Sequence, residues 1–283
     1  MRITENERDV LIVVNAKTGE VLEDARAVTR EMDEARERRI ANERRIADEY
    51  AKYGNFYWMF YNLQKPLFSG EINGATVTRL MYLATYMSYD SNKLTYENGK
   101  PVLRSQLPEV LNVSPETVNK FVASCVRKKL MKIDENGCVY LMGDFKKGKI
   151  RKHDLSNEKA IVRVYYLAIQ WLYEKASPRD HKVLSYLFSI LPWVNRRYNI
   201  ICSNPEEKDL DLINPLSTAE MCEIIGYDKS QAQRLKSNLY GIRINGKPAI
   251  SWVNNCDGEK IFINPRIYYA GTEAKEVKVL GKF

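Results

Sequence analysis

The sequence has few of the residues on which metal sites and disulfide frameworks depend. It contains two histidines, His153 and His181, which form no HxH or HxxxH pair. Its five cysteines are widely spaced and include no CxxC pair: Cys125, Cys138, Cys202, Cys222 and Cys256. This pattern argues against a zinc site, a disulfide framework and a nicking enzyme with paired histidine ligands. We expect reduced, partly buried thiols, no metal and no cofactor.

Long apolar segments are also missing. No run of 18 or more apolar residues occurs. The N-terminal segment MRITENERDV has no hydrophobic core of a signal peptide. We therefore expect a cytoplasmic protein with no membrane partner.

Catalytic groupings are likewise absent from the sequence. A tyrosine recombinase needs an Arg/His cluster to activate the scissile phosphate, and the sequence has none despite its 18 tyrosines. Residues 143–149 fit the phosphate-loop pattern GxxxxGK, but Ile150 stands where Mg²⁺ chemistry needs Ser or Thr. We expect no enzyme activity and no catalytic residues. The lysines of this segment are expected to meet a DNA backbone or solvent.

Charge is present in excess and is unevenly placed. The chain of 283 residues has 44 Lys and Arg against 36 Asp and Glu, a formal net charge of +8. Residues 1–52 carry a net charge of −2, whereas residues 53–283 carry +10. The strongly basic charge of residues 53–283 favours a polyanionic partner such as nucleic acid.

The N-terminal region is predicted to form a β-hairpin followed by a long charged helix. The hairpin would span residues 10–22 around a turn that contains Gly19. Residues 23–52 contain nine acids, eight bases and neither Gly nor Pro, which is typical of a solvated helix. The heptad line through Met32 continues into Arg39, so a solvated connector is favoured over a dimerising coiled coil. A homodimer through this helix stays open as the alternative.

The first globular region shows a helix–turn–helix pattern followed by a hairpin. The aromatic run 56–61 is expected to pack in a core, and a helix is predicted over 74–89. Ser105 is predicted to cap a short helix that ends at Leu111, and Ser114 with Pro115 begins a second helix that runs to about residue 129. Strands 131–133 and 138–141 flank a turn at Gly137.

The same order of elements returns downstream. Helices are predicted over 183–193 and from Ser217, which opens a capping box. Asp228 is predicted to cap a helix over 229–240, and a hairpin pairs 249–254 with 260–264. Residues 160–173 between the two patterns read as a buried strand plus helix or as a lone core helix. The fold class predicted is α+β, with two winged helix–turn–helix domains preceded by a β-hairpin and a long charged helix. The domains would be 1–55 (hairpin and charged helix), 56–150 (first winged helix), 151–175 (connection) and 176–283 (second winged helix and tail).

The second helix of each pattern carries the candidate DNA-binding residues. A major groove admits one α-helix, whose side chains must offer donors and acceptors to base edges. The wings supply further cations for phosphates. The candidates are Thr117, Asn119, Lys120, Arg127 and Lys132 in the first pattern, and Lys229, Ser230, Gln231, Gln233, Arg234, Lys236 and Lys260 in the second. For any one of these residues the alternative is a solvated helix face. The helix of the second pattern carries the denser set of candidates.

Three short segments carry a resemblance to a known group. They are Val14–Glu20, Leu83–Asp90 and the closing Phe262–Gly271, in which Asn264 and Pro265 end a wing strand. Together they resemble phage and plasmid winged-helix proteins of Firmicutes, including plasmid replication-maintenance proteins. The first repeat lacks the Asn-Pro step, so the two wings need not dock alike.

The functional reading that follows is sequence-specific binding of double-stranded DNA by a transcriptional regulator of a bacterial mobile element. A replication initiator that binds origin repeats would use the same surfaces and remains an alternative. A third reading, from another class, is an interaction scaffold whose winged helices bind protein.

Overall fold

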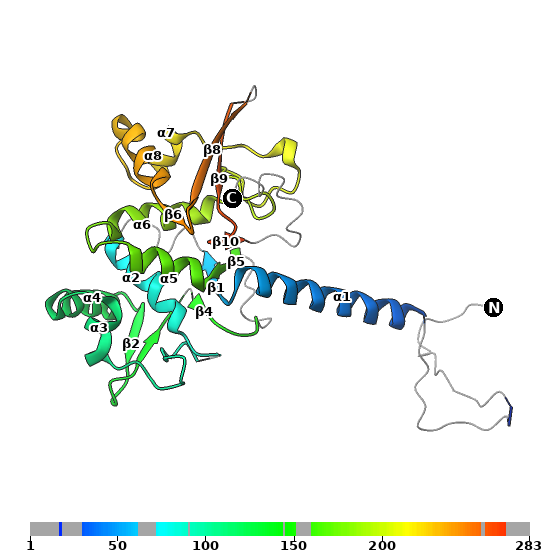
Figure 1. Cartoon of the computed structure of the whole chain (residues 1–283), viewed down its shortest axis with the longest axis horizontal. Helices are drawn as coiled ribbons and strands as arrows, with labels where there is room; N and C mark the ends of the chain where they lie inside the picture. The colour runs from blue at the N-terminus through cyan, green and yellow to red at the C-terminus, as the bar shows by residue number, and fades with distance from the viewer. Residues whose placement is uncertain are drawn as a thin grey trace, which may run out of the picture. The chain divides into compact units, whose positions relative to one another are not determined.

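Runs of helices and runs of antiparallel strands follow one another along the chain in a computed structural model. The structure describes residues 17–18, 30–61, 72–89, 91–143, 145–150, 160–255 and 258–269. The protein is of the α+β class, as the sequence predicts. It divides into two compact units, Met1–Lys52 and Tyr53–Phe283, which we call unit 1 and unit 2 (Figure 1). The predicted domain boundaries within unit 2 stay predictions.

A single long helix dominates the described part of unit 1. Helix α1 spans Arg30–Tyr53, and its residues 31–41 are all exposed. Arg38 donates from Nε to the Glu34 carbonyl oxygen one turn earlier, at 3.1 Å. The predicted charged helix is thus confirmed from residue 30 onward. The predicted hairpin over residues 10–22 lies outside the described residues apart from two turn positions.

A four-stranded antiparallel sheet joins distant parts of unit 2. Its strand order is β10-β5-β1-β4. The strands are β1 (Phe56–Tyr61), β4 (Phe145–Lys146), β5 (Ala160–Tyr165) and β10 (Tyr268–Tyr269). Tyr57 pairs with Val164, which also pairs with Tyr268 of β10. The sheet therefore ties the start, the middle and the end of unit 2 together. The aromatic run 56–61 packs here, because Tyr57 and Met59 are fully buried.

Three helices form the centre of unit 2. They are α2 (Gly74–Leu83), α5 (Tyr166–Lys175) and α6 (His181–Ile190). A Cβ on Gly74 would lie 2.1 Å from the Ser185 hydroxyl oxygen, so α2 approaches α6 as closely as only glycine permits. Thr78 donates its hydroxyl to the His181 carbonyl oxygen at 2.8 Å. His181 itself is buried at the start of α6.

The first helix pair and its hairpin follow α2. They comprise α3 (Leu107–Leu111), α4 (Pro115–Arg127), β2 (Met131–Ile133) and β3 (Val139–Leu141). Asn112 adopts a left-handed conformation (φ 48°) and makes the turn between the two helices. Gly137 turns the hairpin with φ 77°. These elements match the predicted order.

The second helix pair has an additional small hairpin. Its elements are α7 (Thr218–Ile224), the 3-10 turn η6 (Lys229–Gln231), α8 (Ala232–Tyr240), β6 (Arg243–Ile244), β7 (Lys247–Pro248), β8 (Ile250–Asn255) and β9 (Gly258–Ile263). Asn245 and Gly246 both have positive φ at the β6–β7 turn. That pair is the commonest two-residue hairpin turn, and the sequence analysis overlooked it.

Several predicted boundaries need correction. Ser105 lies inside a 3-10 turn, η2 (Arg104–Gln106), and does not cap α3, because that turn leads directly into the helix. The helix predicted over 74–89 ends at Leu83 and continues only as the 3-10 turn η1 (Ala84–Tyr86). Residues 160–173 resolve as strand β5 followed by α5, the first of the two alternatives.

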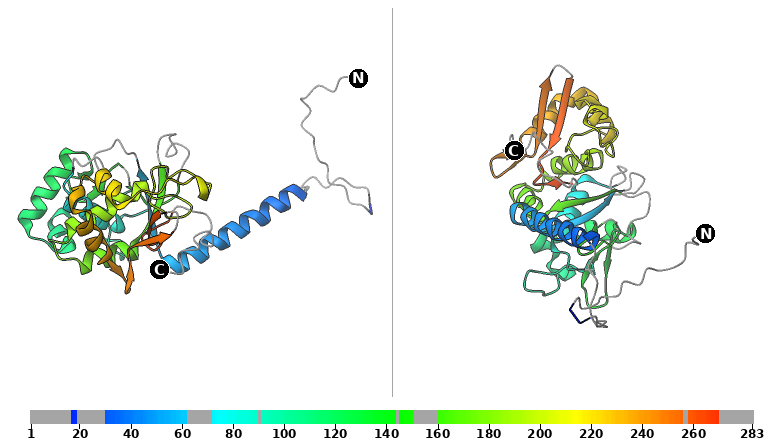
Figure 2. Two further views of the ribbon diagram at one scale, coloured as in Figure 1. Left: turned by 90° about the horizontal axis from the view of Figure 1, so that it is seen from above. Right: turned by 90° about the vertical axis from the view of Figure 1, so that its right-hand side faces the viewer.

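One continuous core runs through both helix pairs. It includes Leu107 and Phe121 of the first pair and Leu235 and Leu239 of the second. The two pairs lie toward opposite ends of unit 2, with α2, α5 and α6 between them (Figures 1 and 2). Four cysteines are buried free thiols, while Cys256 lies outside the described residues. Within the described part of the chain, none of the helices has the length and apolarity to cross a membrane.

Candidate nucleic-acid interface

Helix α4 presents one polar face to solvent. Ser114 caps it, since its Oγ accepts a hydrogen bond from the Thr117 amide at 3.3 Å. Its opposite side buries an apolar stripe of Val118, Phe121, Val122 and Cys125. The exposed side carries Asn119, Lys120 and Arg127.

The cap and neighbouring charges modify this face. The Thr117 hydroxyl lies 2.9 Å from Ser114 Oγ and is engaged in the cap. The Lys120 ammonium pairs with Glu116 at 2.6 Å, and both side chains are more than three-quarters exposed (78% and 77%). Exposed pairs of this kind contribute little to stability, so a phosphate can replace the carboxylate.

Arg104 extends the face and was missed by sequence reasoning. Its guanidinium donates to Asn119 Oδ1 at 3.3 Å, which brings the turn before α3 against the exposed side of α4. Both side chains also border a hollow of about 520 Å³ together with Asn136 and Gly137 of the hairpin turn. A basic residue immediately before the first helix was the only sequence signal for this role.

The hairpin β2–β3 carries an exposed cation on its first strand. Lys132 is exposed on β2 and pairs in register with Tyr140. The hairpin turn is held by Asp134, whose Oδ1 accepts from the Cys138 amide at 2.8 Å. That hydrogen bond is the largest cause that lowers the pKa of Asp134, so the turn keeps its carboxylate at neutral pH.

The segment from η6 through α8 carries the denser set of polar side chains. Asp228 Oδ1 accepts from the Ser230 amide at 2.9 Å, and hydrogen bonds from Ser230 hold the pKa of Asp228 below its ordinary value. Leu235 and Leu239 are the buried residues of α8. The exposed polar side chains of η6 and of the first turn of α8 are Lys229, Ser230, Gln231, Gln233 and Arg234.

Several of these side chains have partners within the protein. Lys229 pairs with Glu223 at the end of α7, and Arg234 Nη1 lies 3.5 Å from Gln231 Oε1. Both contacts are exposed. Gln233 makes no side-chain hydrogen bond to any described residue. Breaking such exposed contacts costs little free energy, so this face can offer amide and guanidinium groups to a ligand.

Lys236 behaves differently from the other predicted residues. Its Nζ lies 2.6 Å from Glu259 Oε1, with only 27% and 24% of the two side chains exposed, and 5.3 Å from the centre of the Trp252 ring. It thus ties α8 to the hairpin β8–β9. Lys260 follows Glu259 directly on β9 and is half-buried. Because successive side chains of a strand point to opposite faces, it lies on the other face of the hairpin from Glu259.

Glu259 links three elements. Its Oε2 accepts from the amide and the hydroxyl of Thr218 at 3.1 and 2.8 Å, and that hydroxyl also accepts from Trp252 Nε1 at 3.1 Å. Burial raises the pKa of Glu259, but the hydrogen bonds from Lys236 and Thr218 outweigh this effect and lower the pKa overall. The carboxylate is a structural anchor that fixes α7, α8 and the hairpin against one another.

Sequence reasoning placed its candidates on two surfaces, and the structure brings them together only within each pair. Asn119 and Lys120 lie with Arg104 on the first, while Gln231, Gln233 and Arg234 share the second. Among the described residues, no group of three or more His, Cys, Asp and Glu could hold a metal ion.

Comparisons with known proteins leave the chain's family open. No protein-family model, no curated protein and no solved structure matches the chain. The resemblance to phage and plasmid winged-helix proteins therefore stays a prediction from short segments.

Proposed function

We propose that the two helix pairs and their hairpins are winged helix–turn–helix modules through which the protein binds double-stranded DNA sequence-specifically. One observation carries the proposal. The η6–α8 segment exposes Gln233 and Arg234 on a face with several further polar groups, while Leu235 and Leu239 of the same segment are buried in the core. A regulator of a mobile element and a replication initiator would both use this face.

The chemistry of that face fits base readout. An arginine fork donates two hydrogen bonds to guanine O6 and N7, and a glutamine amide both donates to and accepts from adenine. Arg234 and Gln233 are adjacent on a helix whose diameter matches the width of the major groove. We assign Arg234 to a guanine edge and Gln233 to an adenine edge. Ser230 and Gln231 lie at the beginning of the same segment, which in helix–turn–helix proteins is nearest the bases.

The first module adds a second, less dense contact. Asn119 offers an amide to a base edge, and Arg104, which hydrogen-bonds to it, can donate to the base or to a phosphate. Lys120, Arg127 and Lys132 are assigned to phosphates. Because both modules belong to one unit, binding by one raises the effective concentration of the other at a neighbouring segment of the duplex.

The proposed interface leaves out two of the residues predicted from the sequence. Lys236 is left out of the proposed interface, because its ammonium is taken up by Glu259 and covered by Trp252. Thr117 is left out because its hydroxyl completes the cap of α4. Lys229 and Lys260 remain as phosphate contacts.

Selection of bound duplexes from a random pool at physiological salt tests the proposal. We expect enrichment of a defined motif, together with affinity that falls as salt rises, since phosphate contacts release counterions. Repeats of the motif would identify an initiator, and a single or palindromic site would identify a regulator. Enrichment of no motif, or binding without salt dependence, would contradict the proposal and favour the protein-binding scaffold.

A further inference from the structure

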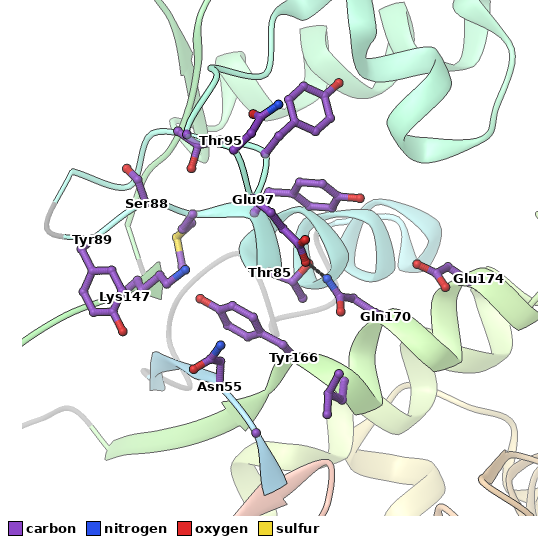
Figure 3. A pocket seen from close by; sticks show the side chains of 17 residues that line it. Asn55, Thr85, Ser88, Tyr89, Thr95, Glu97, Lys147, Tyr166, Gln170 and Glu174 are labelled. Carbon is purple, nitrogen blue, oxygen red and sulfur yellow. Dashed lines mark hydrogen bonds between the residues drawn. The ribbon is translucent and has the colours of Figure 1, made fainter. Parts of the chain in front are cut away.

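A large hollow of unit 2 is lined by none of the residues on the exposed faces of α4 and α8. It has a volume of about 990 Å³ and opens between η1, the chain that follows β4 and helix α5 (Figure 3). Its wall includes Tyr89, Lys147 and Tyr166 on one side and Gln170 with Glu174 on the other. Such a volume is enough for a ligand of nucleotide size.

Lys147 is the notable residue of this wall. It is half-buried, and burial alone lowers the pKa of its ammonium group. Its Nζ lies 5.1 Å from the centre of the Tyr89 ring and 4.8 Å from that of Tyr166. No carboxylate among the described residues forms an ion pair with it. Among the described residues this partly desolvated cation is stabilised by ring faces, and an anionic group placed beside it gains a strong partner.

Aromatic rings surround the rest of the hollow. The Tyr166 ring is buried in the wall between Lys147 and Gln170 (Figure 3). Tyr86 and Tyr96 also line the hollow, with ring centres 6.3 Å apart in an edge-to-face arrangement. Tyr89 is 67% exposed at the rim. Nucleobases stack on such rings with little dependence on which base it is, because every base has a flat aromatic face.

The far side of the hollow offers hydrogen-bond acceptors. Gln170 donates its amide nitrogen to the Thr85 hydroxyl at 3.3 Å, which leaves the amide oxygen available to accept. Glu97 and Glu174 are exposed carboxylates of the same wall. In nucleotide sites a carboxylate can accept hydrogen bonds from the hydroxyls of the ribose.

We propose that this hollow binds a nucleoside phosphate, with its phosphate on Lys147, its base against the tyrosine rings and its hydroxyl or amino donors toward Gln170 and the two carboxylates. Either a free nucleotide or a nucleotide within a single strand supplies this chemistry. The site is unlike a phosphate loop, because the phosphate partner is Lys147 and not the Lys149 of the GxxxxGK pattern.

Titration calorimetry on the full chain tests the proposal. The probes are the four ribonucleoside monophosphates, the corresponding nucleosides, inorganic phosphate and a single-stranded oligothymidylate of about ten nucleotides. We expect at least one phosphate-bearing nucleotide probe to bind, and the matching nucleoside to bind at least tenfold more weakly. Binding of monophosphates identifies free nucleotides as the source, and binding of the oligonucleotide alone identifies a single strand.

Matched variants locate the binding. Lys147→Met should weaken it at least tenfold, which is about 1.4 kcal/mol. Lys149→Met removes an exposed lysine outside the hollow and should leave it unchanged. Glu97→Trp places a bulky ring in the hollow from an exposed position and gives a second route if Lys147→Met fails to fold. Binding of no probe would overturn the proposal, and so would binding as tight as that of the wild type by both folded Lys147→Met and Glu97→Trp. Duplex binding through α8 is scored separately with Arg234→Ala, so either proposal can fail alone.

Discussion

Lys236 of α8 and Glu259 of β9 form an ion pair of 2.6 Å across the second helix pair and its hairpin. The carboxylate that receives Lys236 also receives two hydrogen bonds from Thr218 at the start of α7. One side chain therefore sets the position of the helix that exposes Arg234. The residue that we propose contacts DNA and the residue that orients its helix are thus close in sequence, since Lys236 is two positions from Arg234.

Glu259→Ala should destabilise unit 2 by about 1–3 kcal/mol, because it leaves a half-buried ammonium and the Thr218 donors without their acceptor. Urea unfolding of the wild type and the variant measures the difference. Glu116→Ala breaks the exposed pair with Lys120 and is the control, with little expected change. An equal effect of both substitutions would show that Glu259 does not anchor the module.

The pH dependence of stability should report His181. Burial lowers its pKa to about 4 from 6.5, with a further contribution from the charge of Arg79. The unfolded chain therefore binds a proton at higher pH than the folded protein does. Its contribution to stability is complete above pH 6.5 and is lost progressively as pH falls toward 4. His181→Gln should flatten the stability profile in this window, as followed by denaturant unfolding at a series of pH values. A variant as pH-dependent as the wild type would contradict the assignment.

Removing the cap of α7 should cost about 1 kcal/mol. Ser217 Oγ lies 3.3 Å from the Glu220 amide, and Glu220 Oε2 accepts from the Ser217 amide at 2.8 Å. Ser217→Ala removes the first of these bonds, whereas Ser217→Thr keeps a hydroxyl in place. Thermal unfolding should rank the wild type and Ser217→Thr together above Ser217→Ala. Indistinguishable stabilities would mean that the capping box contributes nothing measurable.

Arg234→Ala should weaken binding to the selected duplex by about 1–3 kcal/mol and binding to random duplex far less. Fluorescence anisotropy at several salt concentrations separates the two affinities. Arg179→Ala removes another exposed arginine that lies before α6 and should change neither affinity strongly. Equal losses on both duplexes would reduce Arg234 to a phosphate contact.

Local features of the fold could be predicted from the sequence. Ser114 with Pro115, and Ser217 with Glu220, begin helices where the sequence indicates, because capping depends on residues within one turn. The turn at Gly137 could also be predicted, because a hairpin turn depends on the few residues that form it. The prediction that Ser105 caps α3 was wrong, because Ser105 lies inside the 3-10 turn that leads directly into this helix.

Long-range features could not be predicted in this way. The pairing of Tyr57 with Val164, and of Val164 with Tyr268, joins segments far apart in the chain, and local periodicity does not encode such partners. The same limit applies to the candidate sites. Gln233 and Arg234 could be found from helix periodicity, whereas the capture of Lys236 by Glu259 depends on how a hairpin packs on a helix.

Hydroxyl-radical footprinting on the selected duplex tests the central claim most directly. The claim is that α8 and α4 read one DNA molecule together. We predict two protected segments for the wild type. The double variant Gln233→Ala with Arg234→Ala should lose one of them, and Asn119→Ala with Lys120→Ala should lose the other. Wild-type protection that persists unchanged in both double variants would contradict the account.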